Sequence, residues 1–238
     1  VLIVVEGLYS MDGDVPDLKR LVQLKRRYDA WLMVDEAHAL GVLGDRGYGS
    51  AEAAGIDPGD VDIWMGTLSK TLASCGGYIA GSRALITILK HHAAGFVFSV
   101  GLSPPLAAAA LAALEVLEAE PARVERLQAN GKRFLAAARA RGLDTGHSAG
   151  HAIAPILVGD SLKAVALSER LLARGINVLP IVFPAVPMQA ARLRFFLSSE
   201  HTDTDIDAAV AAVGEELEAL DAEGFGVATL IDALAQRR

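Results

Sequence analysis

The chain has 238 residues, 52% of them hydrophobic, and a formal net charge of −7 from 29 acidic and 22 basic side chains. This length suits one large domain or two small ones, and the scattered basic residues argue against a nucleic-acid-binding surface. No apolar stretch reaches the roughly 20 residues of a transmembrane helix, and a single cysteine, Cys75, excludes an internal disulfide and favours a cytoplasmic setting.

Strands and helices alternate in the first half of the sequence. A helix that Asp14 caps, with Pro16 in its first turn, is expected to run to residue 28. Apolar runs predict strands over residues 1–5, 31–38, 61–67 and 76–81. Strands with few polar positions that alternate with helices indicate an α/β fold with a mostly parallel sheet, covered on both faces.

The second half has the pattern of a smaller α+β unit. Residues 104–142 are expected to be helical, with Pro121 as a break between two helices. The remaining predicted elements are strands over 151–159, 176–181 and 191–199 and helices over 161–175, 202–222 and 225–238. We therefore predict part of a large domain in residues 1–120 and a small C-terminal domain in residues 121–238.

Polar side chains follow three of the predicted strands. They are, strand by strand, Glu6 and Ser10, then Asp35 and His38, then Thr67, Ser69 and Lys70. Ligands of open parallel sheets bind outside the carboxyl ends of the strands, so these groups are expected to converge on one pocket. A single Asp at a strand end is most often a helix cap, and a single lysine in a loop is most often solvated. The order found here, Asp-x-x-His after one strand and Thr-x-Ser-Lys after the next, is far less likely to arise by chance.

Residues 35–38 read DEAH, which also occurs as a helicase box. That interpretation requires a phosphate loop of the form GxxxxGK[ST]. The chain has one Gly-Lys pair, Gly131-Lys132, and Arg133 follows it within a predicted helix. The sequence therefore argues against a helicase.

Pyridoxal 5′-phosphate (PLP) chemistry fits these residues better. The cofactor forms a Schiff base with a lysine, and a carboxylate keeps its ring nitrogen protonated. We predict Lys70 as the Schiff-base lysine, Asp35 as the partner of the ring nitrogen and His38 as the contact of the ring hydroxyl. Thr67 and Ser69 would bind the phosphate. Burial of Lys70 among small side chains is expected to favour its neutral form.

Four ordered segments resemble the α-oxoamine synthase family, and the resemblance runs from residue 1 to about residue 220. It implies the fold type I aminotransferase architecture, a homodimer with active sites at the subunit interface, and PLP as cofactor of the large domain. The implied reaction is the decarboxylative condensation of an amino acid with an acyl thioester, carried by coenzyme A or by an acyl carrier protein. The segments are VEGLYSMDGDVPDL, WLMVDEAHALGVLGDRGYG, TLSKTLASCGGYIAG and ARLRFFLSSEHT.

The resemblance also implies roles for residues outside the two motifs. Ser10 matches a serine near the ring hydroxyl of the cofactor. Arg194 matches the arginine that binds the substrate carboxylate, with Arg192 as its nearest rival. Either Ser99 or Ser103 matches a serine that reaches the phosphate in the partner subunit.

The family's N-terminal portion, with a phosphate loop and a histidine stacked on the ring, should precede Val1. We therefore expect the chain to represent the C-terminal two-thirds of a longer polypeptide. Two alternatives stay open: an aminotransferase or lyase of the same fold, which shares Asp35 and Lys70 but needs no acyl thioester, and a non-catalytic subunit of a heteromeric synthase. No metal site is expected.

Overall fold

The computed structural model describes residues 1–227, and the chain divides into two compact units. The first unit comprises Val1–Ser10 and Val15–Glu125, and the second comprises Met11–Asp14 and the chain from Arg126 onward. The assignment of residues 1–120 to a cofactor-binding domain and of 121–238 to a small domain stays a prediction. The predicted helix over 225–238 lies almost entirely outside the described residues.

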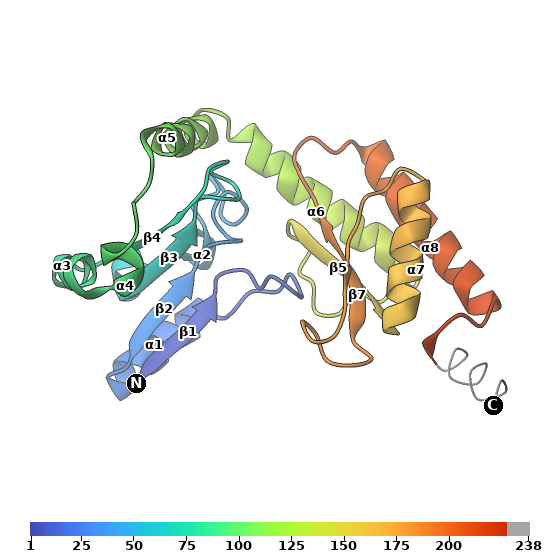
Figure 1. Ribbon diagram of the computed structural model, residues 1–238, viewed down its shortest axis with the longest axis horizontal. Coiled ribbons are helices and arrows are strands. Elements are labelled where there is room, and N and C mark those ends of the chain that lie inside the picture. Colours follow the sequence, from blue (N-terminus) through green and yellow to red (C-terminus); the bar gives the residue numbers. More distant parts are fainter. Residues whose placement is uncertain (228–238) are drawn as a thin grey trace. The chain divides into compact units, whose positions relative to one another are not determined.

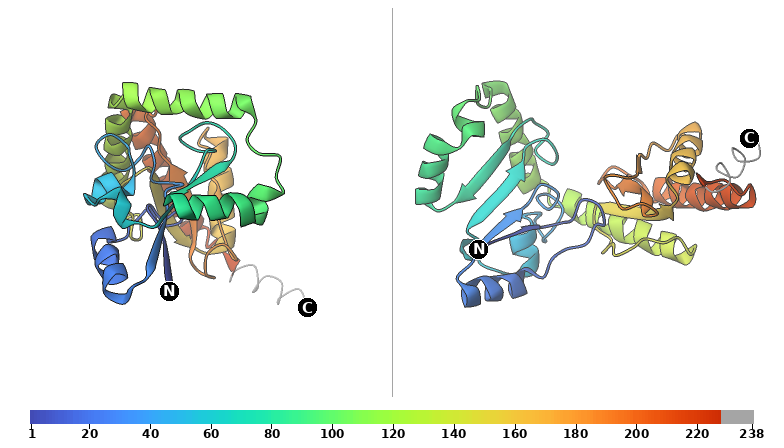
Figure 2. Two further views of the ribbon diagram at one scale, coloured as in Figure 1. Left: turned by 90° about the vertical axis from the view of Figure 1, so that its left-hand side faces the viewer. Right: turned by 60° about the horizontal axis from the view of Figure 1, so that its bottom comes forward.

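A four-stranded sheet in the order β1-β2-β3-β4 organises the first unit (Figures 1 and 2). Strands β1, β2 and β3 are parallel, and β4 is antiparallel to β3. This confirms the predicted α/β fold with a mostly parallel sheet. The strands are β1 (Leu2–Glu6), β2 (Trp31–Asp35), β3 (Ile63–Thr67) and β4 (Gly77–Gly81). The helices are α1 (Leu18–Tyr28), α2 (Ser50–Ala54), α3 (Arg83–His92), α4 (Ala94–Val97) and α5 (Pro104–Ala119), with the 3-10 helix η1 (Pro58–Asp60).

Helix α1 begins later than the sequence suggested. Its cap is Asp17, whose side chain accepts a hydrogen bond from the Arg20 N–H, and not Asp14. Leu18 and Val22 then point into a core with Leu32 and other apolar side chains of the parallel strands. A cap must lie directly before the first buried turn, and Asp17 meets that condition.

Strand β2 is shorter than predicted, because the chain turns immediately after Asp35. The N–H groups of Ala39 and Leu40 both donate to the Glu36 carbonyl, at 2.9 and 3.1 Å. His38 therefore lies in a tight turn and not in a strand.

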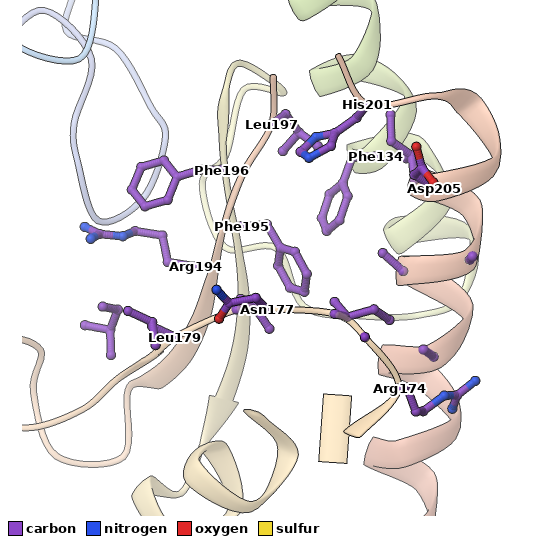
Figure 3. A pocket seen from close by; sticks show the side chains of 18 residues that line it. Phe134, Arg174, Asn177, Leu179, Arg194, Phe195, Phe196, Leu197, His201 and Asp205 are labelled. Carbon is purple, nitrogen blue, oxygen red and sulfur yellow. The ribbon is translucent and has the colours of Figure 1, made fainter. Parts of the chain in front are cut away.

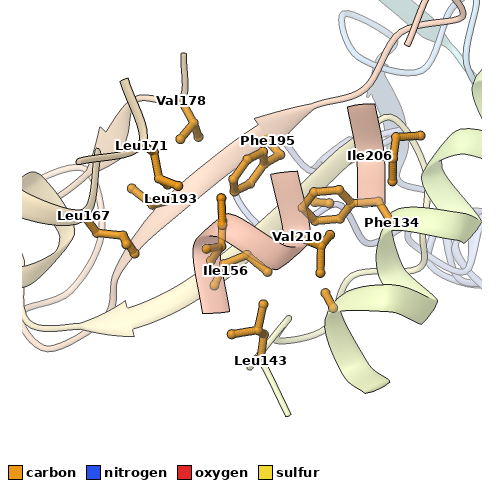
Figure 4. Close-up of a cluster of buried hydrophobic side chains, with 14 of the residues drawn as sticks. Phe134, Leu143, Ile156, Leu167, Leu171, Val178, Leu193, Phe195, Ile206 and Val210 are labelled. Carbon is orange, nitrogen blue, oxygen red and sulfur yellow. The ribbon is translucent and has the colours of Figure 1, made fainter. Parts of the chain in front are cut away.

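The second unit has a three-stranded antiparallel sheet in the order β5-β7-β6. Its strands are β5 (Ile153–Gly159), β6 (Pro180–Ile181) and β7 (Ala191–Phe196), and its helices are α6 (Ala122–Ala140), which begins in the first unit, α7 (Ser161–Ala173) and α8 (Asp203–Ala222). The rings of Phe134 and Phe195 meet with centroids 4.9 Å apart in the core that these elements enclose (Figure 4).

The predicted strand over 176–181 is reduced to Pro180–Ile181. The Ile176 N–H donates a hydrogen bond to the Leu171 carbonyl at 2.9 Å, and the Val178 carbonyl accepts one from the Ser168 hydroxyl at 2.6 Å. These residues therefore bond to helix α7 in place of a neighbouring strand. None of the helices in the described range is long and apolar enough to cross a membrane.

Candidate active site

The carboxyl ends of the three parallel strands in the first unit lie in register. Glu6 pairs with Asp35, and Asp35 pairs with Met65, two residues before Thr67. The polar residues predicted from the sequence therefore emerge at one edge of the sheet, where parallel sheets bind their ligands.

The Asp35 carboxylate is held in a defined orientation. Its Oδ1 accepts a hydrogen bond of 2.8 Å from the Ala37 N–H. The next peptide is fixed as well, because the Glu36 N–H donates to the Met65 carbonyl at 2.7 Å. Asp35 and His38 are both half-buried. The turn therefore carries a carboxylate and an imidazole, each partly accessible, three positions apart in the chain.

Glu36 is a buried carboxylate that the motif analysis missed. It is 6% exposed and accepts hydrogen bonds from the N–H and the hydroxyl of Ser50. Burial raises the pKa of this carboxyl, the Ser50 hydrogen bonds oppose the rise, and the charge of Asp35 adds to it. Gly49 must be glycine here, because its φ is +93° and a Cβ would lie 1.9 Å from a Glu36 oxygen. The adjacent acidic pair in DEAH was the available signal.

Lys70 lies on a loop that connects β3 to β4 and that backbone hydrogen bonds and buried side chains hold in place. The Leu68 N–H donates to the Gly76 carbonyl at 2.9 Å, and the Ser74 N–H donates to the Leu68 carbonyl at 2.8 Å. Leu68 and Leu72 are buried against Ala110 of α5. These contacts hold the loop in one conformation.

The expected burial of Lys70 is wrong for this chain. Lys70 and its neighbours Ser69 and Thr71 are exposed. The reason is that Leu68 and Leu72 take the inward positions of the loop, so that the residues between them face solvent.

Two hydroxyl groups lie together before the lysine. Thr67 Oγ1 and Ser69 Oγ are 2.8 Å apart, and the Thr67 hydroxyl donates to the Gly76 carbonyl at 3.2 Å. Because that carbonyl takes the Thr67 proton, the Ser69 hydroxyl is the donor in the contact between the two side chains.

A direct contact joins the Asp35–His38 turn to the lysine loop. The Thr71 hydroxyl donates to the Leu40 carbonyl at 2.7 Å. A Cβ on Gly41, whose φ is +79°, would lie 2.2 Å from Thr71 Cγ2. The structure therefore brings the two motifs together within the first unit.

The three predicted serines outside these motifs have separate surroundings. The Ser10 N–H donates to Glu6 Oε2 at 2.9 Å at the end of β1. Ser99 and Ser103 are exposed between α4 and α5. The Ser99 hydroxyl donates to the Phe96 carbonyl at 3.3 Å, and Ser103 is the N-cap residue of α5. The choice between Ser99 and Ser103 stays open.

The two candidate arginines belong to the second unit and differ in their surroundings. The Arg192 side chain is 7% exposed and pairs with Asp12 at 2.5 Å. Arg194 is half-buried, and its guanidinium carbon lies 4.8 Å from the centroid of the Phe196 ring. Burial lowers the pKa of Arg194, yet a guanidinium remains charged at neutral pH.

Arg194 is one of the residues that line a cavity of about 740 Å³ within the second unit. Figure 3 shows Arg194 and Phe196 on one side of strand β7 and Phe195 on the other, facing Phe134. The other polar residues of the lining are Arg174, Asn177, His201 and Asp205.

The groups at the sheet edge suit one kind of ligand. A primary amine, a carboxylate and paired hydroxyls can bind, respectively, an aldehyde, a cationic ring nitrogen and a phosphate. The half-buried position of Asp35 and the exposed position of Lys70 leave both able to reach such a molecule.

Together, the sheet topology and the residues at its carboxyl edge define an α/β protein with the fold type I aminotransferase-like fold. Residues 1–213 match the family described as aminotransferase class I and II. The chain belongs to this family.

Curated relatives are 8-amino-7-oxononanoate synthases, which agrees with the predicted resemblance to α-oxoamine synthases. The enzyme of Symbiobacterium thermophilum is 44% identical over 219 residues, which cover 91% of this chain and 55% of the relative. 8-Amino-7-oxononanoate synthase 1 of Bacillus subtilis is 44% identical over 209 residues, covering 88% and 53%. The chain thus spans about half the length of the curated relatives it matches.

Solved structures of the same kind are also similar. Serine palmitoyltransferase of S. paucimobilis with a bound PLP–myriocin aldimine has a TM-score of 0.87 and 28% identity, covering 93% of this chain and 56% of that one. 8-Amino-7-oxononanoate synthase of Francisella tularensis has a TM-score of 0.81 and 27% identity, covering 91% and 63%.

Proposed function

We propose that the full-length protein is a PLP-dependent α-oxoamine synthase. It condenses an amino acid with an acyl thioester and releases carbon dioxide. The observation that carries the proposal is that Asp35 and the Lys70 loop follow neighbouring parallel strands at one sheet edge, with a hydrogen bond between Leu40 and Thr71 that joins the two loops. The names of the relatives make 8-amino-7-oxononanoate the first product to test.

The residues of the sheet edge would hold the cofactor as follows. The Lys70 amine would bind its aldehyde carbon, and Asp35 Oδ2 would accept the ring N–H while Oδ1 stays on Ala37. The neighbouring hydroxyls of Thr67 and Ser69 would bind the phosphate. When bound, PLP accepts the electron pair of the bond that breaks at the substrate α-carbon.

Two side chains would then act on the substrate, and His38 would act on the cofactor. Arg194 binds its carboxylate, since a guanidinium can pair with both oxygens and so fixes orientation as well as charge. The Lys70 amine would take the α-proton of the substrate. His38 donates a hydrogen bond at the ring hydroxyl.

We also propose the assembly implied by the resemblance, a cytoplasmic homodimer with shared active sites. Exposed apolar side chains in α4 and in the segment that follows it support a protein interface there, because Phe98 is 87% exposed and Phe96, Val100 and Leu102 are also exposed. Sedimentation of the full-length protein measures the subunit number. A monomer with full activity contradicts this part of the proposal.

The test of the proposed function has two readouts. Full-length protein with PLP is treated with borohydride and mapped by mass spectrometry, and the label is expected on Lys70. Lys90→Ala, an exposed lysine near the end of α3, is the matched control and should leave the label in place, whereas Lys70→Ala should abolish it. Carbon dioxide release is then measured with and without the acyl thioester. Release that ignores the thioester identifies a lyase, and a label on another lysine overturns the role of Lys70.

A further inference from the structure

The ion pair of Arg192 with Asp12 joins residues that lie far apart in the sequence. Arg192 Nη1 is 2.5 Å from Asp12 Oδ1, and it also donates to the Met11 carbonyl at 3.3 Å. The Arg192 Nε–H donates to the Ala190 carbonyl at 3.1 Å. One nearly buried guanidinium is therefore occupied by a carboxylate and two carbonyls, which leaves it badly placed to bind a substrate.

The segment that carries Asp12 is docked on the same unit by its backbone. A Cβ on Gly13 would lie 2.2 Å from the Ile153 carbonyl oxygen, and the φ of Gly13 is +67°. The Ala149 N–H donates to the Gly13 carbonyl at 3.2 Å. Residues 11–14 consequently pack as part of the second unit, against the start of strand β5.

Met11 is the link between the two arginines. Its carbonyl accepts from Arg192, and its sulfur lies 3.6 Å from Nη1 of Arg194. The Phe196 ring centroid lies 4.8 Å from the guanidinium carbon of Arg194. The Arg194 guanidinium thus contacts a thioether and an aromatic ring, and the residue that carries the thioether is bonded through its carbonyl to Arg192.

We propose that Arg192 is a positioning residue for Arg194: its ion pair with Asp12 holds Met11 where the thioether orients the Arg194 guanidinium toward the carboxylate of the amino-acid substrate. This inference rests on the proposed role of Arg194. It assigns different tasks to the two arginines of the ARLR segment: Arg192 has a structural role and Arg194 binds the ligand. A guanidinium that is already oriented loses less conformational freedom when it binds a carboxylate.

The test compares variants of the full-length enzyme by steady-state kinetics. Asp12→Asn removes the charge of the pair without changing its size, and Met11→Leu removes the sulfur while keeping an apolar side chain. Both are expected to raise KM for the amino acid, Asp12→Asn by about tenfold, and to change kcat less than twofold or so. The control is Arg133→Gln, which removes an exposed ion-pair network on α6 of the same unit and should leave KM unchanged.

The effects of the single and double variants on KM distinguish a failure of this inference from a failure of the proposed function. If Arg194→Lys raises KM and Asp12→Asn adds little in that background, both arginines act through one contact, as proposed. If Arg194→Lys raises KM while Asp12→Asn and Met11→Leu do not, the positioning role is wrong and the role of Arg194 stands. If Arg194→Lys leaves KM unchanged, the role of Arg194 itself falls. Should Asp12→Asn fail to fold, Met11→Leu alone decides, and an unchanged KM overturns the inference.

Discussion

Gly66 offers a direct test of how the site is supported. It lies in β3, one residue before Thr67, and pairs with Tyr78 of β4. A Cβ on Gly66 would lie 2.3 Å from Cζ and 2.4 Å from the hydroxyl oxygen of Tyr78. The ring therefore lies across the glycine, and Gly66→Ala forces it to move.

The magnitude follows from two opposing effects. Overpacking of this kind costs about 1–3 kcal/mol, while Ala in place of Gly in a strand recovers about 0.5–1 kcal/mol. The difference of these effects runs from about 0 to about 2.5 kcal/mol, and from the middle of this range we expect Gly66→Ala to lower the unfolding free energy by about 1 kcal/mol. Displacement of the adjacent Thr67 should also weaken cofactor binding.

The assay is guanidinium denaturation of the full-length protein in a double-mutant cycle. Gly66→Ala is made in the natural background and with Tyr78→Ala, where the clash is gone and the substitution should be neutral or stabilising. Gly95→Ala in α4 is the control, because no atom lies within 4 Å of the added Cβ. An equal cost of Gly66→Ala in both backgrounds refutes the reasoning.

Two further predictions concern the acidic pair of the site. Asp35→Asn keeps the size of the side chain but removes the charge beside the ring nitrogen, so kcat should fall by about 10²-fold or more. An absorbance titration should still show cofactor binding, and near-normal turnover contradicts the role of Asp35 as partner of the ring nitrogen. For Glu36, burial raises the pKa above its value in the unfolded chain, so the folded state holds the proton more tightly and the unfolding free energy falls as pH rises through that window. Glu36→Gln removes this loss, so its stability relative to the natural protein should increase as the pH rises above the ordinary pKa of a glutamate carboxyl; a pH-independent difference in denaturation midpoints argues against it.

The sequence by itself determined the elements and the spacing of the motifs. Apolar runs and turn residues placed β1, β3 and β7 closely, and Pro121 separates α5 from α6. The spacing from Asp35 to His38 and from Thr67 to Lys70 placed these groups at strand ends. Such features depend on residues close together in the chain, where periodicity and backbone preferences act directly.

Only the tertiary structure decided which charges are buried and what they contact. Asp12 and Arg192 pair across 180 positions, Glu36 meets Ser50, and Tyr78 covers Gly66. The tertiary structure also decided that Lys70 is exposed, although the sequence had suggested that it would be buried. Burial and pairing depend on side chains that approach from distant parts of the chain, and no local pattern in the sequence records which of them will meet.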